Sequence, residues 1–159
     1  MRENTDCFLA YGGESAARCL VAQLGRENAV GRIRLLCPAG REERVEGAVA
    51  MGVGGLLSAE TLRAVAESAE APYTLLGFRP TPLTLGPYAV ERLAAAATMS
   101  GAAMVYADFL TEKGGTTARH PLIDYQEGSL RDDFDFGPLV LLRSELLKAW
   151  AQEWDTEGR

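Results

Sequence analysis

The chain has 159 residues, 47% hydrophobic and 24% charged, which is the composition of one water-soluble globular domain. Its net charge of −6 comes from 16 basic and 22 acidic residues without a clustered basic stripe, which argues against a nonspecific nucleic-acid binder. No apolar run approaches the roughly 18 residues that cross a bilayer, and the polar start is not a signal peptide, so we expect a single cytoplasmic domain over residues 1–159.

The first 40 residues predict a β–α–β unit. An apolar strand at 7–11 is stopped by two glycines, a helix at 16–24 follows the capping residue Ser15, and a second strand covers 30–37. Three widely spaced cysteines (Cys7, Cys19 and Cys37) fit neither a disulfide framework nor a metal knuckle. We expect all three to be small buried side chains, with a reactive thiol as the alternative.

The middle of the chain continues the alternation. Residues 48–51 fit either a short strand or an irregular link, and Ser58 is expected to cap a helix that runs to Ala69. The later expected elements are a strand at 73–76, a helix opened by Pro87 and ending at Ser100, a strand at 103–109, a hairpin tip at 111–116, a strand at 139–142 and a helix from Ser144 to Trp150 or Trp154.

Strands that alternate with helices predict an α/β fold with a doubly wound, mainly parallel sheet flanked by helices, plus a late hairpin or mixed strand. Ligands bind such sheets outside the carboxyl ends of the strands. Four segments are expected there: 11–13, 38–40, 77–79 and 106–108.

From about Pro72 to Leu147 the chain resembles bacterial family-2 glycosyltransferases, which have the GT-A nucleotide-sugar fold. The resemblance rests on the order of the elements 73–76, 87–100 and 103–108 and on Leu139–Leu147, where a strand ends in Arg143 and a helix begins. The segment Ile123–Gly137 resembles a subgroup of glycosyltransferases from gut Bacteroidetes. The resemblance implies inverting transfer of a sugar from a nucleotide-diphospho-sugar, with Mg²⁺ or Mn²⁺, to a glycan or lipid-linked acceptor.

The chain departs from that family at its metal site. Family members carry an Asp-x-Asp after the third strong strand, and its carboxylates hold the cation. Here the positions are Gly77, Phe78 and Arg79. Arg79 could bind phosphate bidentately in place of a metal, and a surface arginine is the alternative.

Two further family features are missing from the printed sequence. The acidic residue that reads the nucleobase after the second strand has no counterpart at 37–40. The family's catalytic base lies downstream of the helix that contains Leu146 and Leu147, whereas this sequence stops at Arg159. We therefore expect either the N-terminal, nucleotide-sugar half of a longer enzyme or a catalytically inactive GT-A-like binding or interaction module.

The candidate site residues follow from these positions. For donor binding they are Tyr11, Arg79, Tyr106 and Asp108, with Asp108 also as a metal ligand. A simpler structural role for Asp108 is to accept N–H bonds in the following turn.

A second set of candidates lies in 131–137, where three carboxylates interleave with two phenylalanines. Asp132 and Asp133 are the catalytic candidates, and Arg131 and Asp135 are the acceptor-binding ones. The alternative is an edge strand with its phenylalanines inward. Trp150 and Trp154 are expected to form a packing face for a C-terminal segment or a second copy.

Overall fold

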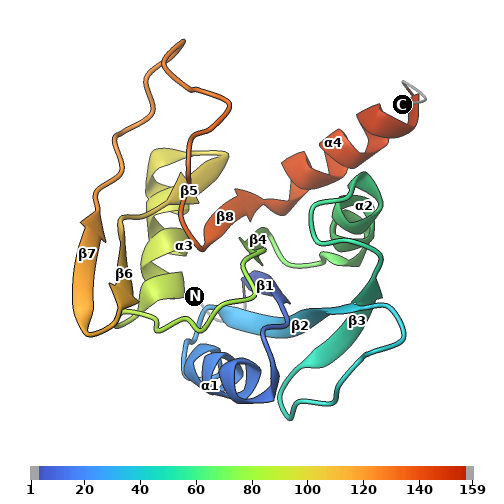
Figure 1. The fold of residues 1–159 in the computed structure, drawn as a ribbon. Helices are drawn as coiled ribbons and strands as arrows, with labels where there is room; N and C mark the ends of the chain where they lie inside the picture. Colours follow the sequence, from blue (N-terminus) through green and yellow to red (C-terminus); the bar gives the residue numbers. More distant parts are fainter. Residues whose placement is uncertain (1–3, 157–159) are drawn as a thin grey trace.

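Strands and helices alternate along the chain in this computed structural model, which describes residues 4–156 and side chains as far as Glu153 (Figure 1). The elements in chain order are β1 (Thr5–Ala10), α1 (Glu14–Leu24), β2 (Val30–Pro38), β3 (Val49–Val53), α2 (Ala59–Ser68), β4 (Tyr73–Gly77), α3 (Ala89–Ser100), β5 (Met104–Tyr106), β6 (Phe109–Lys113), β7 (Thr116–His120), β8 (Val140–Arg143) and α4 (Ser144–Thr156).

The main sheet has six strands in the order β3-β2-β1-β4-β8-β5. β1 lies parallel to β2 and β4, and β2 lies parallel to β3. Of the two readings of residues 48–51, the strand is confirmed, and it covers Val49–Val53. β8 runs antiparallel to both β4 and β5. The predicted mainly parallel α/β sheet with a mixed strand is therefore confirmed.

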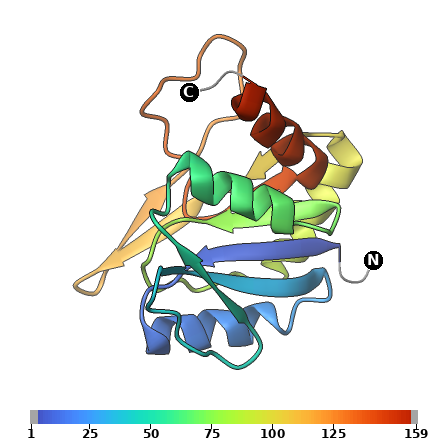
Figure 2. The ribbon, with the colours of Figure 1, turned by 90° about the vertical axis from the view of Figure 1, so that its right-hand side faces the viewer.

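Alternate side chains of the buried strands face opposite helix layers, as the period of two in a strand requires. Cys7 and Leu9 of β1 pack in the cluster that includes residues of α1 and α3, whereas Phe8 packs in the cluster that includes residues of α2 and α4. Figure 2 shows α1 on one side of the strands and both α2 and α4 on the other. The sheet is thus doubly wound.

Burial of the cysteines was predicted correctly at two of three positions. Cys7 and Cys37 are buried, and burial raises the pKa of the Cys7 thiol far above its ordinary value. Cys19 is exposed, because it lies on the outer face of α1 while Leu20 and Val21 face the core.

Two of the four expected helix starts are wrong, whereas α4 begins at Ser144 as expected. α1 begins at Glu14 after Gly13, whose φ of 100° is available to glycine, and no side chain caps it, so Ser15 is inside the helix. α3 begins at Ala89, two residues after Pro87. The cap predicted at Ser58 is also confirmed, since its hydroxyl accepts a hydrogen bond from the Thr61 N–H at 3.2 Å.

The predicted late hairpin is β6 and β7, which pair antiparallel as a separate two-stranded sheet. Residues 121–139, called the long loop below, connect this hairpin to β8 and contain no helix or strand. None of the helices within residues 4–156 combines the length and apolar character needed to cross a membrane.

Candidate functional site

The carboxyl ends of β1, β2, β4 and β5 lie at one edge of the main sheet, called the carboxyl edge below, and β8 begins there because it runs the opposite way. The loops after β1 and β4 touch. A Cβ added to Gly12 would lie 2.8 Å from the carbonyl oxygen of Pro80, so only glycine permits this approach. This contact brings Tyr11 and Arg79, the neighbours of Gly12 and Pro80, to adjacent places on the edge.

Tyr11 has a partner that the sequence did not suggest. Its hydroxyl donates a hydrogen bond to Glu43, 32 positions further on, in the charged loop that follows β2. The pKa of Tyr11 is raised to about 12, mainly by this hydrogen bond to a carboxylate and secondly by burial of the hydroxyl. Glu43 therefore supplies a carboxylate at the carboxyl edge, although the end of β2 itself has none. The sequence feature that could have indicated Glu43 is the charged run 41–46, which directly follows a strand.

Glu43→Gln is expected to lower the pKa of Tyr11 from about 12 toward its ordinary value of 10.0, because the hydrogen bond then lacks a charged acceptor. NMR titration of the tyrosine ring carbons measures this shift. Glu42→Gln is the matched control, since Glu42 accepts from the Gly40 N–H and not from Tyr11. Equal Tyr11 titration in both variants would contradict the assignment.

Arg79 follows β4 and is held by two residues from the second half of the chain. Its guanidinium forms an ion pair with Asp135 of the long loop, and it lies 5.6 Å from the centre of the Phe109 ring. The two paired side chains are 42% and 51% exposed, so water reaches both. The pairing joins the loop after β4 to the last part of the long loop.

Tyr106 and Asp108, at the end of β5, hold the first residues of the long loop. The Tyr106 hydroxyl donates to the carbonyl oxygen of Ile123 at 2.9 Å, and the Leu122 N–H donates to Oδ1 of Asp108 at 2.7 Å. The structural role considered for Asp108, acceptance of a backbone N–H, is therefore observed, but toward a residue 14 positions away instead of the following turn.

Tyr106 also holds the last part of the long loop. Its ring makes edge contacts with Phe134 and Phe136, with centres 6.0 and 5.2 Å apart, and the two phenylalanine rings are 4.7 Å apart. Phe134 and Phe136 are half-buried while Asp135 is exposed, so the alternation expected of an edge strand is present. The expected edge strand itself is not formed, since the backbone of this segment pairs with no other strand. The two phenylalanine rings pack on Tyr106 instead.

The remaining candidates of the long loop lie on its exposed side. Arg131 pairs with Asp133 at 3.0 Å, and both side chains are mostly exposed. Asp132 is also exposed. The structure thus places Arg79, Tyr106 and Asp135 in one connected group, and it places Arg131, Asp132 and Asp133 on the neighbouring loop surface.

Asp108 is the residue expected to bind a divalent cation at this edge. Within the described residues, no three His, Cys, Asp or Glu side chains come together as metal ligands. Asp108 also uses one carboxylate oxygen for Leu122. A cation held by Asp108 would therefore take most of its oxygen ligands from the donor diphosphate and from water.

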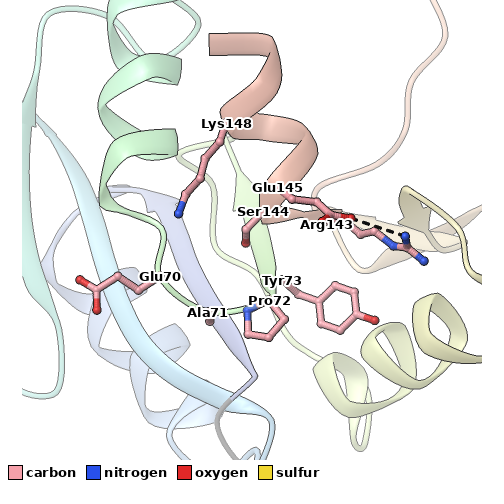
Figure 3. A pocket seen from close by; sticks show the side chains of 8 residues that line it. All are labelled: Glu70, Ala71, Pro72, Tyr73, Arg143, Ser144, Glu145 and Lys148. Carbon is pink, nitrogen blue, oxygen red and sulfur yellow. Dashed lines mark ion pairs between the residues drawn. The ribbon is translucent and has the colours of Figure 1, made fainter. Parts of the chain in front are cut away.

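A cavity of about 380 Å³ lies at the opposite edge, between the start of β4 and the start of α4. Figure 3 shows Glu70, Tyr73, Arg143 and Lys148 around it. Its buried hydroxyl, Ser144, shares a 2.7 Å hydrogen bond with Thr74. The lining mixes both charges, and none of the predicted site residues is part of it.

Of the two tryptophans expected to form a packing face, the structure describes the side chain of Trp150. Trp150 is 59% exposed and borders a small apolar hollow with Leu62 of α2 and Leu147 of α4. The Trp154 side chain lies outside the described residues.

Comparison with solved structures places the fold. The chain is similar to 2-C-methyl-D-erythritol 4-phosphate cytidylyltransferase from Thermus thermophilus, with a TM-score of 0.59 and 16% identity over 97% of this chain and 77% of that one. No family model matches the chain, and neither does any curated protein sequence. The chain therefore shares its fold, a mainly parallel α/β sheet with helices on both faces, with this solved structure.

Proposed function

We propose that the carboxyl edge binds a nucleotide-diphospho-sugar and that the chain is the donor-binding half of an inverting glycosyltransferase. The meeting of the loops after β1, β4 and β5 around Arg79 is the observation that carries this proposal. Doubly wound sheets bind nucleotides at this edge. The resemblance of residues 72–147 to family-2 glycosyltransferases supports a sugar nucleotide over other nucleotides.

Two features suit the diphosphate of such a donor. α1 begins at Glu14, just after the carboxyl end of β1, so the positive end of its dipole lies at the carboxyl edge, and no side chain caps its first N–H groups. Arg79 stands on the adjoining loop and offers a planar, permanently charged fork. Together they would neutralise the diphosphate as it leaves, the task that a metal performs in metal-dependent relatives.

The transfer itself would be a single displacement. The acceptor hydroxyl oxygen forms a bond to the anomeric carbon, the bond from that carbon to the diphosphate breaks, and a base takes the hydroxyl proton. Asp132 is the candidate base on the loop beside the edge, because its exposed carboxylate forms no ion pair with Arg131, unlike Asp133. Arg131 and Asp135 are the candidates for acceptor hydroxyls.

Calorimetry with UDP-glucose, GDP-mannose and CTP, each with EDTA and with Mn²⁺, tests the proposal. We expect one of the two sugar nucleotides to bind with the same affinity in both conditions, because Arg79 and a helix end need no metal. Binding of CTP alone, or of no nucleotide, would overturn the proposal of a glycosyl donor site.

A binding module without turnover is the second candidate. The lack of a carboxylate cluster among the described residues and the pairing of Arg79 with Asp135 favour it. Release of UDP or GDP in the presence of glycan acceptors separates the two candidates, since a module binds the donor and releases none.

A further inference from the structure

The long loop is attached at both ends and free in its middle. Asp108 and Tyr106 hold residues 122 and 123, and the Tyr106 ring holds Phe134 and Phe136. Between these points the side chains are exposed, Tyr125 at 66% and Leu130 at 48%. An ion pair between Asp135 and Arg79 also attaches the loop to the body of the fold.

Asp135 pairs with Arg79, the side chain that the proposed donor site would use for phosphate. Arginine binds carboxylates and phosphates through the same fork of N–H groups, so the Arg79–Asp135 pair and an Arg79–phosphate pair compete. Asp135 also accepts a 2.8 Å hydrogen bond from the Gly137 N–H, which fixes its carboxylate toward the start of β8. The Phe109 ring, with its centre 5.6 Å from the Arg79 guanidinium carbon, is a second contact of Arg79 that does not involve Asp135.

We propose that Asp135 is an internal competitor that holds Arg79 in the resting state, and that a diphosphate displaces it and thereby loosens the last part of the long loop. The proposal rests on the donor site proposed above. Partner exchange is feasible because both side chains are partly exposed, and an exposed ion pair contributes little to stability.

Asp135→Asn removes the negative charge that pairs with Arg79. It keeps a side-chain oxygen that can accept the hydrogen bond from the Gly137 N–H. Asp124→Asn is the matched control: Asp124 is an exposed aspartate of the same loop. Affinity is measured by calorimetry with inorganic pyrophosphate and with the sugar nucleotides, and loop opening is measured by amide hydrogen exchange of residues 121–139.

We expect D135N to bind pyrophosphate and the donor about two- to five-fold more tightly than the unaltered chain, the size of one exposed ion pair. Exchange in 134–137 should rise in D135N without ligand, and in the unaltered chain when pyrophosphate is added. D124N should do neither.

The outcomes separate this inference from the proposed function. If the unaltered chain binds a sugar nucleotide and D135N binds it equally or more weakly, the proposed donor site is supported and the competitor role of Asp135 is wrong. If pyrophosphate binds D135N more tightly and no sugar nucleotide binds, the competitor stands and the proposed donor is wrong. If neither ligand binds either protein, both proposals fall.

Discussion

Arg79→Ala is expected to weaken binding of the sugar nucleotide about 10- to 100-fold, because a hydrogen-bonded charge contact of this kind contributes about 1.5–3 kcal/mol. The structure gives the reason for a large effect. Arg79 is the cation that the loop after β4 brings to the carboxyl edge, and no three His, Cys, Asp or Glu side chains form a metal-binding group within the described residues. Calorimetry at fixed ionic strength measures the loss.

Two controls show whether the fork of Arg79 matters. Arg79→Lys keeps the charge and loses the planar pair of donors, so an intermediate affinity is expected. Arg92→Ala removes another exposed arginine, from α3, and should leave the affinity unchanged. Thermal melting should be similar in all three variants because the Arg79–Asp135 pair is partly exposed. Unchanged affinity in Arg79→Ala would place the donor phosphates elsewhere.

Asp6→Asn is expected to lower the free energy of unfolding at pH 7 by about 2–4 kcal/mol, because breaking a buried ion pair leaves its partners unsatisfied. The Asp6 side chain is 4% exposed and pairs with Arg32 at 2.6 Å. It also accepts hydrogen bonds from the Glu70 and Ala71 N–H groups at 2.8 and 2.9 Å. One carboxylate thus joins β1 and β2 to the segment that leads into β4.

The same contacts define a pH dependence. Burial alone would raise the pKa of Asp6, but the hydrogen bonds from Arg32 and from the two backbone N–H groups outweigh it and hold the pKa below the ordinary value of 3.8. Because the pKa of Asp6 is lower in the folded state than in the unfolded state, its ionised form stabilises the fold. This stabilisation is complete at pH values above the unfolded-state pKa, and it is lost as the pH falls through the folded-state pKa.

Urea unfolding at several pH values tests both statements. The gap between the unaltered chain and Asp6→Asn should be full at pH 7 and shrink below about pH 4. Glu14→Gln removes an exposed carboxylate that pairs with Arg18, and it should cost less than about 0.5 kcal/mol. A gap of the same size at pH 7 and pH 2 would contradict the role given to Asp6.

Local patterns predicted most elements because they depend on residues close in the chain. The apolar runs at 73–76 and 139–142 became β4 and β8 with shifts of one residue. Helix starts were less predictable. Gly13 and Tyr88 precede α1 and α3 in backbone conformations with positive φ, which the nearby Ser15 and Pro87 do not reveal.

Part of the candidate site was also predictable. Since the strands before Tyr11, Arg79 and Tyr106 are parallel, their carboxyl ends had to meet at one edge, and they do. The partners of these residues were not. Glu43 lies 32 positions from Tyr11, and Asp135 lies 56 positions from Arg79, so no local spacing relates them.

The sequence by itself determined the α/β alternation, the inward faces of the strands and the edge at which site residues gather, because these follow from periodicity and parallel order. Only the tertiary structure decided the strand order, the reversed direction of β8 and the path of the long loop. The reason is physical: a strand that returns antiparallel at this place in the sheet starts at the carboxyl edge. The long loop that leads into β8 therefore brings Asp135 to Arg79 and Phe136 to Tyr106, although these residues are far apart in the sequence.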